Sequence, residues 1–319
     1  MSNASSKQGK AYEYACLMSL FRELKHYRPV NIEQNSSLTV NKAAYDSIDQ
    51  VMREIFDISA DAATKTILDF EPKLSERCDD MLTLSLQKDA EGEKGDVRDI
   101  LAIRQAQNWE IGLSIKHDHK AVKHSRLSKT IDFGEKWYGV PCSNEYWDVV
   151  NPIFTRLEKE HASDTEWREI RDKVDAVYGP VLGAFVSEVQ KAYDKDESIA
   201  SRIAEYLLGK FDFYKIISID KDKTTLVQAF NFKGTLNKAS KDCRPKFEVP
   251  ISVLPTRIIK IEKRPNCPKK NYVDLYMDNG WTFSLRIHSA ATIVEESLKF
   301  DVQLIGRPAT VVEISSNWL

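Results

Sequence analysis

Apolar residues recur at helical spacing in the first part of the chain. From Gly9 to Leu24 the apolar positions fall three and four residues apart, which predicts a helix. Residues 39–68 show the same spacing and are expected to form helices with a break near residues 57–59, where Ser59 would cap the second. Residues 81–86 alternate with period two, which predicts a strand, and the polar segment 89–95 predicts a turn.

Two more strands are predicted after this turn, over residues 99–103 and 109–116. Three consecutive strands form a meander, on one face of which the earlier helices are expected to pack. A basic segment that carries Lys120, Lys123, His124 and Arg126 is predicted to be a helix that leaves directly from the third strand. The order up to residue 130 is therefore helix, strand, strand, strand, helix.

The last third of the chain has a different pattern. After a helical region over residues 165–210, strands are predicted at 214–219, 225–232, 258–263, 272–277, 281–287, 300–305 and 309–315. We therefore expect the α+β fold class, with one domain over residues 1–210, a helical insertion at about 30–80, and a β-rich module over residues 211–319.

Composition and charge refine this picture. The 319 residues are 42% hydrophobic, enough for a substantial core, and the net charge of −2 gives no overall signal for a polyanionic partner. Basic residues are locally concentrated, however: residues 111–136 hold six Lys/Arg against three acids, and residues 241–270 hold nine against three. Either cluster alone is more often a solvated face, but the two together favour contact with phosphates.

The five cysteines are scattered and form no CxxC pair, so neither a disulfide framework nor a thiolate zinc site is expected. This pattern is typical of a reducing compartment. The sequence shows no signal peptide and no apolar run of the ~18–20 residues that span a bilayer. We therefore expect a soluble cytoplasmic protein.

The candidate chemistry lies on the second and third predicted strands. Asp99 begins an apolar strand and is a better candidate Mg²⁺ ligand than Asp96, which lies in the turn and has a turn or capping role as its alternative. Lys116 ends the next strand, where its ammonium would lie beside the acids and stabilise charge on an attacked phosphate. This combination predicts a metal-dependent nuclease site, and a plain edge-strand lysine is the alternative.

A second carboxylate has to come from elsewhere in the chain. Glu110 shares a strand face with Lys116 but lies about 20 Å from it at ~3.3 Å per residue. Ser114 is nearer, but a hydroxyl is a poor Mg²⁺ ligand. Glu13 on the first helix is the candidate, with Gly9 before it to allow a close approach to another element, and an ordinary exposed helix residue is the alternative.

Three histidines form a competing group. His117, His119 and His124 surround Asp118, and this spacing leaves open a zinc hydrolase or a general base. No third ligand at metal spacing is evident, so contacts to DNA phosphates or bases are favoured for these histidines. Arg126 has the chemistry to recognise guanine, although most arginine contacts to DNA are to phosphates.

The chain resembles the PD-(D/E)XK nuclease superfamily and, more closely, the HaeIII family of type II restriction endonucleases. The segments that carry the resemblance are 8–14 (QGKAYEY), 95–100 (GDVRDI), 112–117 (GLSIKH), 121–128 (AVKHSRLS) and 132–143 (DFGEKWYGVPCS). The central segments are the most specific.

The resemblance implies a restriction-endonuclease-like α-β-β-β-α core, an α/β nuclease core with inserted helices and a C-terminal β-rich module that serves as DNA clamp or scaffold. It also implies Mg²⁺-dependent, blunt cleavage of double-stranded DNA at 5′-GGCC. The superfamily's usual second acid, two residues before the lysine, is Ser114 here. The implied roles are therefore metal ligation by Asp99 and Glu13, with Asp96 as a further candidate, charge stabilisation by Lys116, and support by Ser114.

A type II restriction endonuclease of a restriction-modification system is thus the leading interpretation. Its partners would be double-stranded DNA and, genetically rather than physically, a cognate DNA methyltransferase; no membrane is involved, and the chain would act as a monomer or homodimer. Because Ser114 replaces an acid, a catalytically inactive DNA-binding protein with a nuclease fold is the alternative. The expected DNA contacts are His117, His119, Lys120, Lys123, His124, Arg126, Lys129, Lys263, Arg264, Lys269 and Lys270.

Overall fold

The computed structural model describes residues 2–88, 95–289 and 291–318. Helices and strands are mixed along this chain, which confirms the α+β class. The turn expected over residues 89–95 lies, except for Gly95, outside the described residues. Within the described part of the chain, no helix combines the length and the apolar character that crossing a membrane requires.

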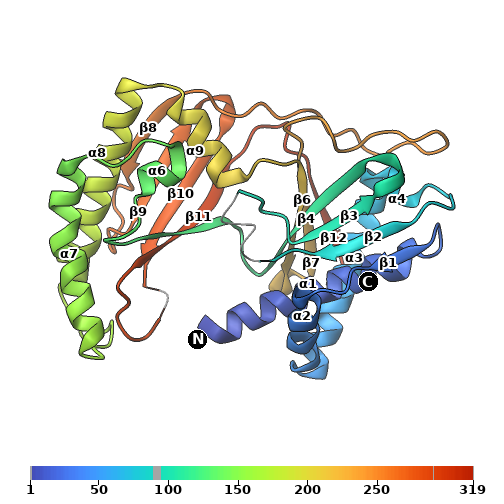
Figure 1. Cartoon of the computed structure of the whole chain (residues 1–319), viewed down its shortest axis with the longest axis horizontal. Helices are drawn as coiled ribbons and strands as arrows, with labels where there is room; N and C mark the ends of the chain where they lie inside the picture. The colour runs from blue at the N-terminus through green and yellow to red at the C-terminus, as the bar shows by residue number, and fades with distance from the viewer. Residues whose placement is uncertain (1, 89–94, 290, 319) are drawn as a thin grey trace.

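A seven-stranded mixed sheet forms one half of the molecule (Figure 1). The expected meander is confirmed, because β2, β3 and β4 pair antiparallel, whereas β4 pairs in parallel with β6. In spatial order the strands are β1 (Val30–Ile32), β2 (Leu82–Leu86), β3 (Ile100–Arg104), β4 (Trp109–His117), β6 (Phe213–Ile219), β7 (Thr224–Phe230) and β12 (Glu313–Asn317).

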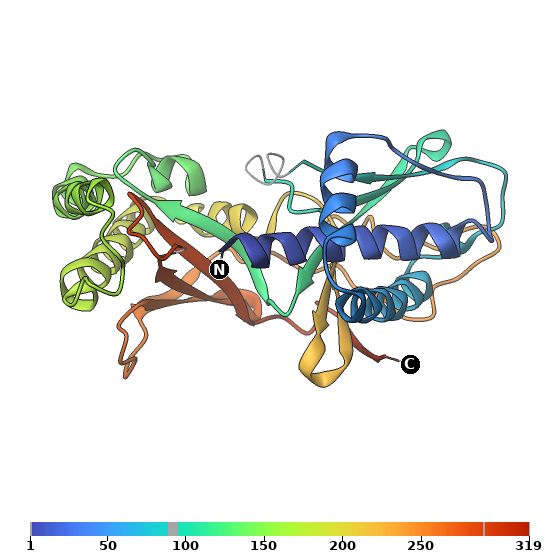
Figure 2. The ribbon, with the colours of Figure 1, turned by 90° about the horizontal axis from the view of Figure 1, so that it is seen from below.

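Helices α1 (Ser2–Leu24), α2 (Ser36–Asp46), α3 (Gln50–Phe70) and the short α4 (Pro72–Ser75) accompany this sheet. Apolar residues of α1 and α3 share one buried core with the strands, so the two helices cover one face of the sheet. The N-terminal end of α1 is directed toward the other half of the molecule (Figure 2).

The break between the two helices of the insertion was misplaced. Asp49 caps α3 by accepting a hydrogen bond from the backbone N–H of Met52 at 2.9 Å, so the break lies at residues 47–49 instead of 57–59. Ser59 is fully buried inside α3, where its hydroxyl forms hydrogen bonds with Tyr12 and Thr225. A serine can sit inside a helix when its side chain has tertiary partners of this kind.

The second half is a five-stranded antiparallel sheet packed against helices. Its strands, in spatial order, are β5 (Ala121–Leu127), β11 (Leu298–Gly306), β10 (Thr282–His288), β9 (Tyr272–Met277) and β8 (Ile258–Lys263). The accompanying helices are α6 (Phe133–Tyr138), α7 (Asn144–Ala162), the π-helix η2 (Lys173–Tyr178), α8 (Gly179–Lys195) and α9 (Ile199–Leu208).

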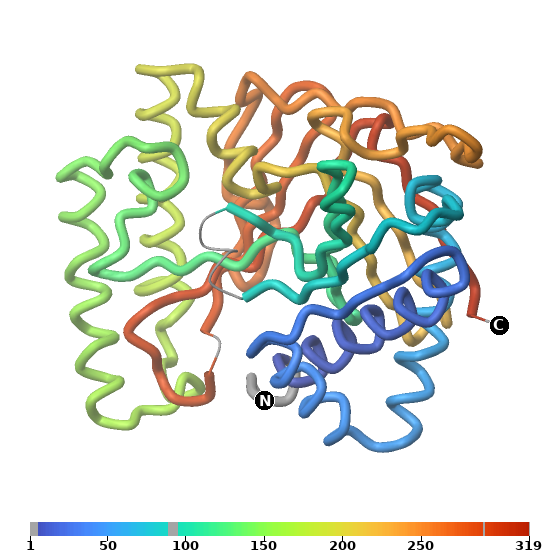
Figure 3. The backbone as a smooth tube through the Cα atoms, turned by 45° about the vertical axis from the view of Figure 1, so that its right-hand side comes forward, coloured from blue at the N-terminus to red at the C-terminus, as the bar shows by residue number. Residues whose placement is uncertain are grey.

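The prediction of a basic helix after residue 117 is wrong, because this segment is strand β5. Ala121, Ser125 and Leu127 are buried, whereas His124 and Arg126 are exposed, and this alternation has the period of a strand. The tube in Figure 3 shows this segment passing from one half of the molecule to the other. The first helix after β4 is instead α6, which follows β5. The parallel pairing of β4 with β6 requires a crossover connection, which here runs from β5 to α9.

The boundary expected at residue 210 does not separate the two sheets. Strands β6, β7 and β12, which come from residues 211–319, complete the first sheet, and β5 from residues 1–210 is an edge strand of the second. Long-range strand pairing, which local patterns do not specify, decides this division.

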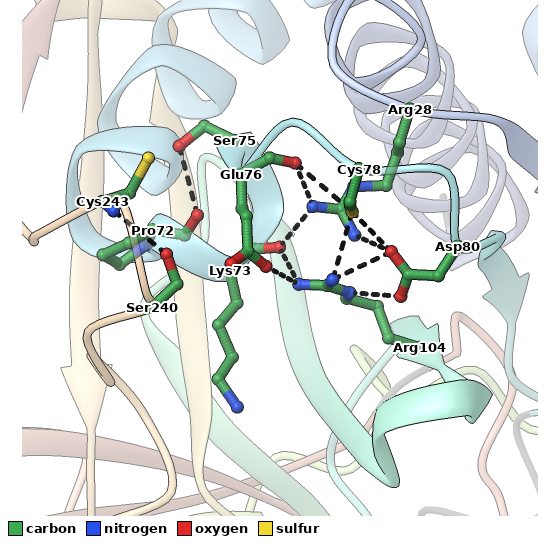
Figure 4. Close-up of polar contacts among 10 residues, drawn as sticks. All are labelled: Arg28, Pro72, Lys73, Ser75, Glu76, Cys78, Asp80, Arg104, Ser240 and Cys243. Carbon is green, nitrogen blue, oxygen red and sulfur yellow. Dashed lines mark hydrogen bonds and ion pairs between the residues drawn. The ribbon is translucent and has the colours of Figure 1, made fainter.

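Two buried arginines, Arg28 and Arg104, form a network with carboxylates at the C-terminal end of β3 (Figure 4). Asp99 lies at the other end of this strand. Arg104 is fully buried and forms a two-point ion pair with Asp80, with nitrogen–oxygen distances of 2.8 and 2.9 Å. Its Nη1 also donates to Glu76 at 2.7 Å, and Arg28 donates to Asp80 at 3.0 Å. The paired carboxylates make burial of these cations tolerable.

Candidate active site

Strands β3 and β4 bring Asp99 and Lys116 together, as expected. The Lys116 ammonium lies 3.2 Å from Oδ2 of Asp99. The same oxygen accepts the backbone N–H of Ile115 at 2.6 Å and the Ser114 hydroxyl at 3.3 Å. All three contacts use Oδ2, so among the described residues they leave Oδ1 free for a further contact.

Glu13 joins this site from α1, which packs against β4. Its Oε2 accepts a hydrogen bond from the side-chain amide of Asn41 on α2 at 2.7 Å. Burial and the nearby Asp99 carboxylate raise the pKa of Glu13 to about 8, although Lys116 and Asn41 act in the opposite direction. Gly9 does not provide the expected close approach, because a Cβ there would meet nothing within 4 Å.

Asp96 lies in the same cleft but is held by other side chains. Arg98 contacts both of its oxygens at 2.8 Å, and Gln87 donates to it at 2.9 Å. Arg98 also pairs with Glu110 at 2.8 Å. These contacts favour a structural role for Asp96 and weaken it as a metal ligand.

The packing of Arg98 explains the glycine on β4. A Cβ at Gly112 would lie 1.9 Å from Cδ of Arg98, so only glycine leaves room for the arginine side chain. The guanidinium of Arg98 then lies over the Phe211 ring, 4.1 Å from its centroid. The role of Arg98 was not predicted, because nothing in the local sequence pattern indicates these partners.

A cleft of about 780 Å³ contains Glu13, Asp99 and Lys116. Its walls come from both halves of the molecule, since residues of β5 and α9 line it together with those of α1 and β4. Cations outnumber acids among its lining residues, as suits a phosphate backbone. The cations are Lys88, Arg98, Lys116, Lys123, Arg126, Lys136 and Lys299, and the acids are Glu13, Asp96 and Asp99.

Three of the predicted DNA contacts, Lys123, His124 and Arg126, line this cleft from β5. Lys123 donates to the backbone carbonyl of Tyr206 at 2.9 Å and lies over its ring, and burial lowers the pKa of Lys123 to about 8. Arg126 is held by Glu295 at 3.1 Å and Ser297 at 2.7 Å.

His117 is not part of the cleft lining. Its ring packs against Phe56 and Tyr12, with centroids 4.7 and 6.0 Å apart, and its Nε2 lies 2.8 Å from Oδ2 of Asp220. This largely buried position favours a structural role over the DNA contact that we expected.

The other predicted DNA contacts also lie outside the residues that line the cleft. Lys129 donates to Glu158 at 3.2 Å. On or near strands β8 and β9, Lys263 donates to the carbonyl of Gly179, Arg264 pairs with Asp274, and Lys270 pairs with Asp175. His119 and Lys120 lie in the turn before β5, and Lys269 is exposed beside Lys270.

Lys215 on β6 is a buried cation that the sequence analysis missed. Its ammonium donates to the backbone carbonyls of Lys120 and Ala121 at 2.8 and 2.9 Å, and so holds the turn between the two sheets. Burial and the neighbouring Lys116 lower the pKa of Lys215 to about 7. The only sequence signal was a lysine inside an otherwise apolar strand.

A mixed sheet that presents an aspartate, a lysine and a helical glutamate beside a basic cleft is the arrangement of a restriction-endonuclease-like nuclease. The model of the HaeIII restriction endonuclease family matches residues 9–308, and the chain belongs to this family. It is 48% identical over 319 residues to the type II restriction enzyme HaeIII of Haemophilus aegyptius, covering 100% of this chain and 99% of that protein. No solved structure matches the chain.

The comparisons confirm the predicted family and the class of a site-specific deoxyribonuclease. They do not favour the alternative of an inactive DNA-binding protein. Ser114 in place of an acid is therefore compatible with a restriction endonuclease, and the roles of the individual residues follow from the site geometry.

Proposed function

We propose that this restriction endonuclease uses Mg²⁺ to hydrolyse double-stranded DNA at 5′-GGCC and leaves blunt ends. The observation that carries the proposal is the meeting of Asp99, Lys116 and Glu13 in one basic cleft. The recognition sequence rests on the resemblance to the HaeIII family and on 48% identity over the full length to the HaeIII enzyme.

Asp99 and Glu13 are the residues that would hold the metal ion. Both are carboxylates, the ligands that Mg²⁺ prefers, and Oδ1 of Asp99 is available. The pKa of Glu13, raised to about 8 by burial and Asp99, indicates a site with too little positive charge for two ionised carboxylates. A divalent ion held by these two carboxylates would supply this charge, together with Lewis-acid chemistry at the phosphate.

Hydrogen bonds from neighbouring groups hold the two carboxylates of this site in place. The Ser114 hydroxyl and the Ile115 N–H fix Oδ2 of Asp99. Asn41 fixes Glu13 in the same way. The Lys116 ammonium, which pairs with Asp99, would stabilise the charge that develops on the phosphate oxygens during attack by water.

A cleavage assay with mapped ends tests the proposal. Two linear duplexes would be used that differ only in one central site, GGCC in one and GACC in the other. With Mg²⁺ we expect one cut in the first duplex, with blunt ends between the G and C, and none in the second. Intact GGCC duplex with every divalent ion tried, or equal cutting of both duplexes, would reject it.

Lys116→Ala separates catalysis from binding. We expect cleavage to fall by about 100-fold or more, the usual loss when one charge-stabilising donor is removed. Binding to the GGCC duplex in Ca²⁺ should be retained. Lys269→Ala is the matched control, because Lys269 is exposed outside the cleft lining and its removal should leave cleavage unchanged.

The proposal has two consequences for the cell. An active enzyme in the cytoplasm would cut host DNA, so a cognate methyltransferase has to modify the same site, as a genetic and not a physical partner. A palindromic target also suits a homodimer with two-fold symmetry, although a monomer can cut the two strands in turn. The mass of the complex with one GGCC duplex in solution distinguishes a monomer from a dimer.

A further inference from the structure

Two histidines and a buried aspartate converge apart from the Asp99 site, and one of the histidines, His124, lines the cleft. His124 on β5 is directly opposite Asp301 on β11, and His119 comes from the turn before β5. One ligand atom from each residue lies within 4.8 Å of those of the other two. A third ligand for the histidines is not evident from the sequence, because Asp301 comes from a strand near the other end of the chain.

Asp301 has an unusual environment for a carboxylate. Its side chain is 2% exposed, and Oδ2 pairs with Arg286 at 3.1 Å. The other oxygen, Oδ1, is buried and has no hydrogen-bond partner among the described residues. Leaving a buried carboxylate oxygen unpartnered is costly, so this oxygen indicates that something binds to it.

The distances around Oδ1 suit a metal ion better than hydrogen bonds. Nε2 of His119 lies 3.5 Å and Nδ1 of His124 lies 3.8 Å from this oxygen. Both separations exceed those of ordinary hydrogen bonds. Ligands that bind one tetrahedral ion with bonds of about 2.0–2.1 Å lie about 3.4 Å apart, so a small contraction of this group would make a site.

We propose that His119, His124 and Asp301 bind one first-row transition-metal ion of the Zn²⁺ class, with its fourth position open to the cleft. Two imidazoles and a carboxylate suit zinc, whereas Mg²⁺ prefers oxygen ligands alone. The histidine side chains are 39% and 43% exposed, so an ion can enter from solvent. The bound ion would join the turn between the sheets to β11 and add positive charge to the DNA cleft.

The protonation state of the histidines is compatible with this role. Burial lowers the pKa of both imidazoles, and that of His124 falls to about 3 because Lys299 and His119 also lie nearby. This direction favours the neutral imidazole, the form whose nitrogen lone pair binds a metal ion. Lys215, Lys116 and Lys299 act in this same direction on His119, and Asp301 opposes them.

A second group of possible ligands, His117, Asp118 and Asp220, shares only one of these features. Oδ1 of Asp220 is also buried and has no hydrogen-bond partner among the described residues. The distances differ, however, because Nε2 of His117 lies 2.8 Å from Oδ2 of Asp220, within ordinary hydrogen-bond range. This direct contact makes His117 a useful comparison for His124.

A proton on Nε2 of His119 competes with the metal ion for this nitrogen. The N–H of Ala121 donates to Nδ1 of His119 at 3.2 Å, which places the proton of the neutral ring on Nε2, facing Asp301. Metal binding through Nε2 moves that proton to Nδ1, where it displaces the Ala121 contact. The amide signal of Ala121 in an NMR spectrum should therefore shift when zinc is added.

Metal content and Co²⁺ spectra test the proposal without any cleavage assay, so its outcome is independent of the proposed Mg²⁺ reaction. All variants would carry Asp99→Asn to weaken metal binding at the catalytic site. After removal of metals, Zn²⁺ would be titrated, and we expect one ion per chain and a rise of several degrees in unfolding temperature. Co²⁺ should give the strong visible absorption of a tetrahedral site.

His119→Gln and His124→Gln should each weaken zinc binding by about 100-fold or more, because loss of a ligand exceeds the 10–100-fold effect of losing a supporting contact. His26→Gln is the matched control, since His26 is exposed outside the cleft, and His117→Gln should also leave binding unchanged. Failure to bind zinc, or one zinc per chain in both His119→Gln and His124→Gln, would overturn the proposal.

Discussion

The ammonium of Lys116 lies 3.2 Å from Oδ2 of Asp99, and this pair is the point at which two strands of the meander bring charge to one edge of the sheet. Asp99 immediately precedes β3, and Lys116 lies near the end of β4. Antiparallel pairing places these two strand ends side by side. A single geometric relationship therefore brings together the proposed metal ligand and the cation that we propose stabilises charge on the phosphate.

Asp99→Asn should abolish most cleavage while the protein stays folded. The amide keeps the size of the carboxylate but loses the charge that binds Mg²⁺, so we expect the rate to fall by about 1,000-fold. Single-turnover cleavage of a GGCC duplex measures the effect, and far-ultraviolet circular dichroism checks the fold. Cleavage within a few-fold of the wild type would remove Asp99 from the metal site.

Asn41→Ala should raise the Mg²⁺ concentration needed for half-maximal cleavage by about 10-fold. Asn41 donates to Glu13 at 2.7 Å and fixes a proposed metal ligand, and losing such a contact usually costs 10–100-fold in metal affinity. Lys42→Ala on the same helix is the control, because Lys42 is exposed and pairs with the exposed Asp46. An unchanged Mg²⁺ dependence in Asn41→Ala would mean that Glu13 does not bind the metal.

Gly112→Ala should lower both stability and activity. The new Cβ would lie 1.9 Å from Cδ of Arg98, so the arginine would have to leave its pair with Asp96 at the edge of the cleft. We expect the unfolding temperature to drop by several degrees in a thermal melt.

Gly9→Ala is the matched control for this substitution. A Cβ at Gly9 meets nothing within 4 Å, and alanine is the better helix former by about 1 kcal/mol. This variant should be at least as stable as the wild type. A melt in which the two alanine variants behave alike would contradict the packing explanation.

Removing cations from the cleft should flatten the salt dependence of DNA binding. Lys88 and Lys136 line the cleft, and if each neutralises one phosphate, the double alanine variant should lose about 1.8 units from the slope of log K against log salt. The slope would be measured with a GGCC duplex in Ca²⁺ at several salt concentrations.

The comparison is the double variant Lys269→Ala/Lys270→Ala at the turn between β8 and β9. The sequence analysis predicted DNA contacts there, but these lysines do not line the cleft, and Lys270 pairs with Asp175. We now expect an unchanged slope. If the slope falls as much as in the cleft variant, Lys269 and Lys270 contact DNA, and the DNA-binding surface extends to β8 and β9.

Acid should destabilise the protein partly through Asp80. The hydrogen bond from Arg104 lowers the pKa of Asp80 to about 2, below its ordinary value of 3.8. A carboxyl whose pKa is lower in the folded state stabilises the protein above about pH 4, and this contribution is lost as the pH falls toward 2. Urea midpoints of the wild type and Asp80→Asn should therefore differ at pH 7 and converge near pH 2.

Asp222→Asn provides the reference for this measurement, because Asp222 is exposed on the turn between β6 and β7. Its midpoint should follow that of the wild type at every pH. If the difference between the wild type and Asp80→Asn stays constant from pH 7 to pH 2, the ion pair with Arg104 does not contribute in the way that the structure indicates.

The sequence by itself determined the elements whose periodicity is set locally and the chemistry that their ends present. The first helix, the meander and the strands near residues 258–263 and 272–277 were predicted correctly, because side chains facing one core repeat every 3.6 or 2 residues. Asp99 and Lys116 were predicted to meet for a related reason: neighbouring strands of a meander place their ends together.

Only the tertiary structure decided the features that depend on distant pairing. Strand β5 carries enough charge to resemble a basic helix, and its pairing with β11 makes it a strand of the second sheet. The same pairing brings Asp301 to His124, and the parallel pairing of β6 with β4 buries Lys215 behind the active site. Contacts between residues so far apart in the chain leave no local pattern, because each depends on the position of the whole strand.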